Sequence, residues 1–281
     1  MYRVSKVLNN NGVIAINMEE NQEYVLLGKG VGFGKKVSQR FDKPEGCTTY
    51  RLEQETERGS AKELVKGIEP EYLEIADAIL TESQKVFGDS IDRGILFPLA
   101  DHISFAVARI RRNEQISNPL TEDIKVLFYS EFKVAETLKT ILRERLQIEI
   151  DDHEVGYVAL HIHSAIGDEK VSVAMQTARA VRECIDMIEN ATGKPIDVLS
   201  LSYNRLMNHM KYMVARASTG EKLNLDMNEY MLDQYPQAYK VATDICKNLE
   251  GCIGHKLDET ETGYLAMHIE RVANDEREIE E

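Results

Sequence analysis

The sequence lacks the residue patterns of several common protein classes. Its four cysteines, Cys47, Cys184, Cys246 and Cys252, form neither a CxxC pair nor a zinc-type spacing, so they indicate thiols in a reducing cytoplasm. No apolar segment opens the chain, and none approaches the length of a membrane span. HExxH and GxSxG motifs are also absent. We therefore expect a cytoplasmic protein without membrane insertion and without a cofactor or metal.

Charge is distributed unevenly along the chain. The 281 residues carry a formal net charge of −14. Residues 1–43, in contrast, hold seven basic side chains against four acidic ones, a net charge of +3. Such asymmetry is typical of a small module that binds a polyanion and is joined to an acidic regulatory body. Because 43% of the residues are hydrophobic, the chain has enough apolar surface to bury real cores.

An internal repeat with an offset of 107 residues occupies the second and third parts of the chain. His102 aligns with His209, and His161 aligns with His268. The other three histidines, His153, His163 and His255, have no histidine opposite them. The neighbouring residues that repeat are Leu99, Val107–Arg109, Lys133–Ala135 and Glu154–Ile162 in the first copy, and Leu206, Val214–Arg216, Lys240–Ala242 and Glu261–Ile269 in the second. A repeat of this kind defines the domain plan, and here it also singles out four histidines.

Hydrophobic periodicity divides the chain into a β part and a helical part. Short apolar or alternating runs separated by Asn- and Gly-containing turns predict four strands, at residues 4–8, 13–17, 23–27 and 48–52. From about residue 60 the apolar period becomes that of a helix, and the pattern predicts helices over 101–112, 121–146 and 151–165.

These patterns predict an α+β multidomain fold. We expect a small N-terminal antiparallel β-sheet domain over residues 1–58, followed by two duplicated all-α helical-bundle domains over residues 65–169 and 170–281. Four short strands bury a core that is marginal alone, so a homodimer is the expected state.

Glycine and lysine alternate in the segment from Gly28 to Lys36. The segment is neither a Walker loop nor a dinucleotide fingerprint, because it lacks the required Ser/Thr and a surrounding βαβ unit. It offers backbone that a polyanion can approach, lysines that neutralise phosphate, and an aromatic ring that stacks on a base. Asparagines at the preceding turn add amides for base edges, and this combination suits irregular RNA. The candidate residues are Lys6, Asn9, Asn10, Asn11, Gly28, Lys29, Gly30, Phe33, Lys35 and Lys36. A Gly-rich hairpin with solvated lysines is the alternative.

The duplicated histidines allow several chemistries. A neutral imidazole can be a nucleophile, a base or a metal ligand. His161 and His163 are two residues apart, so on a helix they point to opposite sides and do not form a metal pair. A structural histidine is the alternative for any single one of them. Two duplicated pairs favour a site, and a phosphoryl group accepted on imidazole would bring negative charge into a helical interface and rearrange it.

The same residues resemble a known family. Lys6–Asn11 followed by Gly28–Lys36 resembles the RNA-binding domain of the BglG/SacY-type bacterial transcription antiterminators. The segments around His102 and His161 resemble the first of that family's two PTS regulation domains, and those around His209 and His268 resemble the second. The Gly-Lys segment and His161-Ile-His163 are most similar to the glucose-responsive subgroup.

The resemblance implies a mechanism. As a homodimer, the N-terminal domain would bind a hairpin in nascent messenger RNA and prevent formation of an overlapping terminator in a sugar-utilisation operon. His102, His161, His209 and His268 would be phosphorylated by the sugar phosphotransferase system, through the phosphocarrier protein HPr and a sugar-specific permease (enzyme II). Such a protein is a regulator and not an enzyme.

Two positions depart from the family pattern. Lys29 stands where many members have arginine, so a planar guanidinium that can donate two parallel hydrogen bonds is replaced by a compact ammonium charge. Gly12 intervenes between the asparagine run and the next strand, where it could form a bulge that changes the register of the asparagines.

Two other functions remain open at this point. One is a DNA-binding transcription activator that uses the same regulatory domains, which would need a helix-turn-helix reader. The other is a metal-dependent hydrolase built on a helical bundle.

Overall fold

The computed structural model describes residues 1–274 apart from positions 53–54, 57–58, 115, 168–169 and 198–199. The chain forms two compact units. One combines Met1–Asn118 with Ser130–Val171, and the other combines Pro119–Tyr129 with the chain from Ser172 onward. The domain boundaries expected after residues 58 and 169 fall at positions outside the described residues, and they remain predictions.

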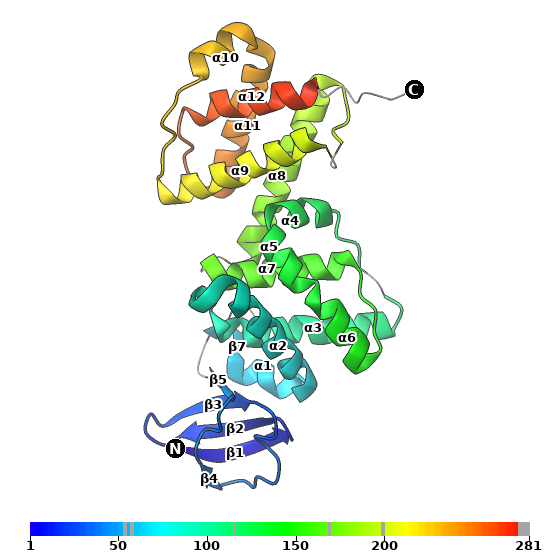
Figure 1. Ribbon diagram of the computed structural model, residues 1–281, viewed down its shortest axis with the longest axis vertical. Helices are drawn as coiled ribbons and strands as arrows, with labels where there is room; N and C mark the ends of the chain where they lie inside the picture. The colour runs from blue at the N-terminus through cyan, green and yellow to red at the C-terminus, as the bar shows by residue number, and fades with distance from the viewer. Residues whose placement is uncertain (53–54, 57–58, 115, 168–169, 198–199, 275–281) are drawn as a thin grey trace. The chain divides into compact units, whose positions relative to one another are not determined.

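The N-terminal part of the first unit is an antiparallel sheet with the strand order β4-β1-β2-β3-β5 (Figure 1). Its strands are β1 (Tyr2–Asn9), β2 (Gly12–Asn17), β3 (Gln22–Leu27), β4 (Arg40–Phe41) and β5 (Thr48–Arg51). Four of them lie where alternation predicts strands. The expectation of a four-stranded sheet was wrong by one strand, because β4 is too short to show any periodicity. A separate two-stranded ribbon pairs β6 (Glu55–Thr56) with β7 (Gly59–Ser60).

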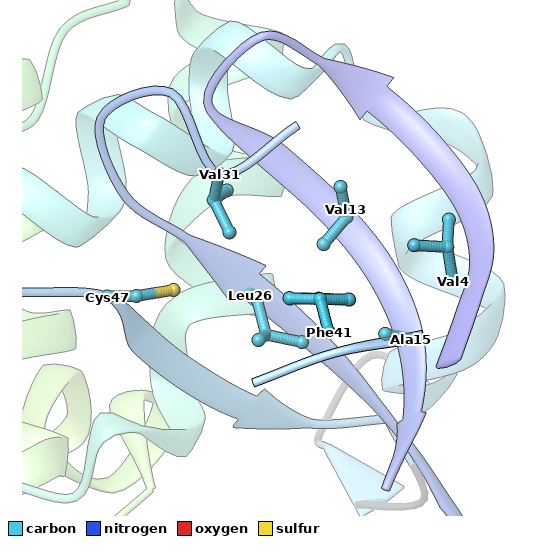
Figure 2. Close-up of a cluster of buried hydrophobic side chains, with 7 residues drawn as sticks. All are labelled: Val4, Val13, Ala15, Leu26, Val31, Phe41 and Cys47. Atoms are coloured by element: carbon cyan, nitrogen blue, oxygen red, sulfur yellow. The ribbon is translucent and has the colours of Figure 1, made fainter. Parts of the chain in front are cut away.

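The sheet buries one apolar cluster. Figure 2 shows its side chains converging from the strands and from the glycine loop, with Val31 pointing from that loop toward the strands. Val13, Ala15 and Leu26 are fully buried, and Val31 is only 2% exposed. The cluster consists of Val4, Val13, Ala15, Leu26, Val31, Phe41 and Cys47. Because Val31 belongs to this core, the glycine loop is fastened to the sheet rather than free to swing.

Helices follow the sheet in the first unit. Pro70 opens α2 at a position where its missing N–H is not needed, and Gly88 ends that helix with a φ of +69°. The helical segments of this unit are α1 (Ala61–Gly67), α2 (Pro70–Phe87), η1 (Gly88–Ser90), η2 (Arg93–Ile95), α3 (Leu96–Arg111), α5 (Tyr129–Ala135), α6 (Thr137–Leu146) and α7 (Asp152–Gly167).

The described secondary structure of the second unit consists of helices joined by turns and loops. Its helices are α4 (Thr121–Leu127), α8 (Val171–Thr192), α9 (Leu201–Thr219), α10 (Asn228–Gln234), α11 (Pro236–Ile253) and α12 (Glu261–Ala273). Short helix α4 packs on α9, where the hydroxyl of Tyr203 donates a hydrogen bond to Asp123 over 3.2 Å. Burial raises the pKa of the Asp123 carboxyl, while the nearby Arg182 opposes that effect.

The single helix expected over residues 121–146 was wrong. Three short helices, α4, α5 and α6, occupy that range. The backbone leaves the helical region at Phe128, with φ −116° and ψ 48°, and the side chain of Phe128 is buried. Tyr235, 107 residues later, breaks the second copy in the same way, with φ −135° and ψ 59°. Phe128 is buried whereas Tyr235 is 37% exposed, so the two copies share the backbone break but not the burial of the aromatic side chain.

No helix among the described residues is long and apolar enough to cross a membrane.

Candidate functional site

The asparagine turn and the glycine loop form one structure in the β-sheet domain. The carbonyl oxygens of Asn10 and Asn11 accept backbone hydrogen bonds from Gly32 and Gly28, each over 2.9 Å. The Asn11 side-chain oxygen also accepts a hydrogen bond from the Gly30 N–H, over 2.9 Å. The structure therefore brings together two segments that the sequence analysis had proposed as one interface.

Glycine is required at two places in this loop. A Cβ atom at Gly32 would lie 2.0 Å from the carbonyl oxygen of Asn9, a distance that no side chain tolerates. Gly30 has a φ of +74°, in the left-handed region that favours glycine. The close packing of the loop against the asparagine turn thus depends on the absence of side chains.

The aromatic and basic candidates lie mostly at the surface of the same domain. The Phe33 ring is 74% exposed, unusual for a large apolar side chain that has no partner to cover it. Lys6, Lys29 and Lys36 are exposed. Lys35 is partly exposed, and its ammonium lies 4.7 Å from the centre of the Phe41 ring.

Gly12 does not form the bulge that was considered for it. It pairs with Asn9 on β1 and with Leu27 on β3, so it belongs to the strand ladder. The irregularities lie on β1 instead, between Val4 and Lys6 and between Val7 and Asn9. The irregularity between Val7 and Asn9 lies directly before the asparagine turn, so the extra residue at this hairpin end is on β1 and not at Gly12.

The first histidine pair lies between α3 and α7. The rings of His102 and His161 have their centres 5.3 Å apart, and both side chains are buried. His102 Nε2 lies 3.5 Å from an oxygen of Glu154, and the other oxygen of Glu154 accepts a hydrogen bond from Arg109 over 2.8 Å. Tyr157 lies beside His102, with ring centres 5.8 Å apart.

The second pair repeats this arrangement between α9 and α12. The rings of His209 and His268 stack with centres 4.8 Å apart. His209 Nε2 lies 3.6 Å from Glu261, and Arg216 donates two hydrogen bonds to that carboxylate, over 2.6 and 2.9 Å. Tyr264 lies beside His209, with ring centres 6.2 Å apart. The offset of 107 residues therefore carries over to a whole site and not only to its histidines.

Burial sets the protonation of the second pair. It lowers the pKa of His209 to about 3, with the neighbouring His268 and Arg216 adding to the effect. It also lowers the pKa of His268 to about 4. Both imidazoles are therefore neutral at pH 7, which is the form that attacks phosphorus.

The carboxylate of the first site stays ionised. Burial alone would raise the pKa of Glu154, but the nearby imidazole of His102 and the hydrogen bond from Arg109 outweigh that effect and hold the pKa below its usual range. A negative charge between a histidine and an arginine keeps both side chains oriented.

Sequence reasoning missed the carboxylates. Glu154 and Glu261 were part of the repeated segments, but they received no role there. Their repetition beside Gly-Tyr was the available signal. The unrepeated His163 also has a partner, since its Nδ1 lies 2.9 Å from the buried Glu131. Within the described residues, no group of three or more histidine, cysteine or acidic side chains could hold a metal ion.

Comparison with known proteins places these sites in a family. The family model of the CAT RNA-binding domain matches residues 2–59, and the PRD domain model matches residues 77–165 and 182–272. Protein GlcT of Staphylococcus haemolyticus is 29% identical over 97% of this chain and 96% of its own length. The GlcA/glcB genes antiterminator of Staphylococcus carnosus is 30% identical, over 95% and 94%. These names fit the glucose-responsive subgroup that the sequence resembles.

Two more relatives extend the comparison. The transcription antiterminator LicT of Bacillus subtilis is 27% identical over 96% of this chain and 98% of its own length. The crystal structure of GlcT CAT-PRDI superposes with a TM-score of 0.51 and 30% identity, covering 59% of this chain and 98% of that one. Together with the sheet, the two helical regions and the duplicated sites, these matches show that the chain belongs to the family of RNA-binding transcription antiterminators that join a CAT domain to two PRD domains.

Proposed function

We propose that this antiterminator reads its RNA with the surface formed by the asparagine turn and the glycine loop, and that the four duplicated histidines control it. The assignment of the RNA surface rests on the hydrogen bonds that join the asparagine turn to the glycine loop, among them the bond from the Gly30 N–H to the Asn11 side chain. The amides of the turn, the exposed Phe33 and the surrounding lysines lie on this one small domain. Splayed bases stack on such a ring, and amides hydrogen-bond to their edges.

The expected RNA is a hairpin with internal loops in the leader of a messenger RNA, and the binding form is a homodimer. Binding would stabilise this hairpin and prevent an overlapping terminator from forming. The small size of the N-terminal sheet supports the dimer, because a domain of this size buries little surface alone. The proposed contact set is Lys6, Asn9, Asn10, Asn11, Gly28, Lys29, Gly30, Phe33, Lys35 and Lys36.

A DNA-binding activator is the other function that PRD-type domains could serve. It would need a recognition helix ahead of the regulatory domains. The described residues before Ala61 form strands and turns and contain no helix. The RNA function is therefore the one that the N-terminal fold supports.

We further propose that His102, His161, His209 and His268 accept phosphoryl groups. The donor would be a phosphohistidine of the phosphocarrier protein HPr or of a sugar-specific permease. In each transfer the P–N bond of the donor breaks as a P–N bond to the acceptor imidazole forms. The neutral imidazoles of His209 and His268, each beside a second histidine, are suited to this attack. The chain itself then acts as a receiver of phosphate and not as an enzyme.

Phosphate labelling tests the histidine assignment. Incubation with phosphoenolpyruvate, the general phosphotransferase proteins and a panel of sugar permeases should give an acid-labile, base-stable label. Replacing the four histidines together by alanine should abolish it. A triple variant of His153, His163 and His255 is the matched control and should keep the label. Full labelling of the quadruple variant would place the acceptor elsewhere.

A further inference from the structure

Helix α2 places a carboxylate directly on the asparagine turn. Asn9 donates its side-chain N–H to one oxygen of Glu74 over 2.7 Å, and Asn11 donates to the other oxygen over 3.1 Å. The acceptor is 63 to 65 residues away in sequence, and its side chain is 19% exposed. Two of the three asparagine amides of the proposed RNA surface are therefore occupied by a single acidic side chain of α2.

The remaining polar atoms of the two asparagines are also engaged. The Asn11 oxygen accepts from Gly30, and the Asn9 oxygen accepts from the Asn11 backbone N–H over 2.8 Å. The N–H groups facing Glu74 are thus the donors through which these side chains could bind a ligand. A carboxylate resembles a phosphate or a base oxygen in accepting two such bonds.

A second contact fixes the helix in this position. Asp77 lies one turn after Glu74 on α2, and it accepts hydrogen bonds from the Tyr50 hydroxyl of β5 and, over 2.8 Å, from Arg93. Arg93 also donates to the Tyr50 hydroxyl over 2.7 Å. Tyr50 is 3% exposed and meets the ring of Phe97 edge to face, with centres 6.4 Å apart. These contacts of Asp77 fix the position of α2, and with it the position of Glu74 beside the asparagine turn.

We propose that Glu74 is an intramolecular competitor of RNA, which occupies Asn9 and Asn11 and must withdraw before the hairpin can bind. The proposal rests on the assignment of these asparagines to the RNA surface. The geometry implies that the apparent affinity for RNA is reduced by the fraction of molecules in which Glu74 is seated. Helix α2 packs on α3, which carries His102, so the helix that blocks the turn is in contact with the helix of a candidate phosphate acceptor.

The test compares RNA affinities of full-length variants. The probe is a hairpin RNA with randomised internal loops, selected on the unaltered protein and then used as one defined sequence. Glu74→Gln removes the charge but keeps the shape, and Glu74→Ala removes the contact. Glu71→Gln is the matched control, because it makes the same charge change one turn earlier on α2. Each variant is first checked by thermal unfolding.

We expect Glu74→Gln to bind about tenfold more tightly than the unaltered chain, since one charged acceptor of two hydrogen bonds is lost. Glu74→Ala should bind at least as tightly, and Glu71→Gln should stay within about twofold. Equal affinities of the Glu74 and Glu71 variants, with binding still lost in Asn11→Ala, would overturn the competition and leave the RNA surface intact. Unchanged binding by Asn11→Ala would refute the assignment of the asparagines themselves, and the competition with it. If Glu74→Gln unfolds early, tighter binding by Glu74→Ala supports the proposal, and its absence overturns it.

Discussion

His209 Nε2 lies 3.6 Å from an oxygen of Glu261, and both side chains are almost fully buried. The same carboxylate is held from the other side by two hydrogen bonds of Arg216. The Glu261 carboxylate thus lies between the neutral imidazole of His209 and the guanidinium of Arg216 at the contact of α9 with α12. A phosphoryl group added to His209 would lie beside this carboxylate, and the repulsion between the two negative charges would disturb the helix interface.

Removing the carboxylate should destabilise the second domain more than the first. Glu261→Gln leaves Arg216, 15% exposed, with a buried charge and no anion, and should lower the free energy of unfolding by about 3 kcal/mol. Glu154→Gln should cost less, because Arg109 is 25% exposed and makes one hydrogen bond. Urea unfolding followed by circular dichroism measures both. Equal losses in the two variants would show that the second hydrogen bond between Arg216 and Glu261 adds nothing to the free energy of unfolding.

The buried histidines predict a specific loss of stability in acid. The pKa values of His209 and His268 are about 3 and about 4 in the folded chain, below the value of about 6.5 expected when unfolded. Above pH 6.5 neither state takes up these protons. As the pH falls below 6.5 only the unfolded chain takes up these two protons, so the free energy of unfolding should drop with a slope that approaches about 2.7 kcal/mol per pH unit for the two histidines together, down to the folded pKa values.

Thermal unfolding between pH 7 and pH 4.5 measures this effect. The His209→Gln/His268→Gln variant should lose less stability over this range than the unaltered chain. His255→Gln, at an exposed position, is the control and should follow the unaltered chain. Parallel curves for all three proteins would contradict the burial argument.

Stacking on Phe33 is tested by truncating the ring. Phe33→Ala should weaken binding of the selected hairpin RNA by about 1–3 kcal/mol, because one base loses its stacking surface. Val37 is also exposed, at 64%, and lies four residues further along the chain. Val37→Ala is therefore the matched control and should leave the affinity unchanged in a calorimetric titration. Equal losses would indicate a general apolar effect and not a stacked base.

Lys29 is expected to neutralise phosphate. Lys29→Ala should weaken binding and reduce the slope of log affinity against log salt by about 1 for one lost contact. Lys43→Ala, another exposed lysine outside the proposed set, should change neither quantity appreciably. A drop in affinity with an unaltered slope would mean that Lys29 reads a base or supports the loop.

Sequence patterns predicted the parts of this protein that depend on local periodicity or on repetition. Strand alternation placed four of the five strands of the sheet, and the offset of 107 residues selected the four histidines that the structure brings into two pairs. What failed was local structure without a periodic signal. The two residues of β4 show no alternation, and the break at Phe128 falls inside a run of helical periodicity.

Contacts that neither a motif nor the repeat marks were not predicted. Nothing near Glu74 in the sequence indicates that it accepts hydrogen bonds from Asn9 and Asn11, since only the packing of α2 on the sheet brings them together. Glu154 is an intermediate case. Its repetition was visible, but its role between His102 and Arg109 depends on the approach of α3 and α7.

The two histidine sites should respond to phosphate in opposite directions. In the first site Arg109 gives one hydrogen bond to Glu154, and its Nε atom is buried without a partner, so a donor is available for a phosphoryl oxygen. In the second site both Nε and one terminal nitrogen of Arg216 already donate to Glu261. Fewer donors therefore remain to offset the repulsion between a new phosphoryl dianion and that carboxylate. Phosphate should therefore tighten the first interface and loosen the second.

Aspartate substitutions imitate part of that charge and allow a direct measurement. His102→Asp/His161→Asp and His209→Asp/His268→Asp should shift the monomer–dimer balance of the full chain in opposite directions in sedimentation velocity experiments. Moving an equilibrium from mostly one state to mostly the other needs about 5.5 kcal/mol, which a few charge-assisted hydrogen bonds can supply. Adding Arg109→Gln to the first double variant should cancel most of its shift, because the available donor is gone. Shifts in the same direction would contradict the opposed response and leave the RNA surface unaffected.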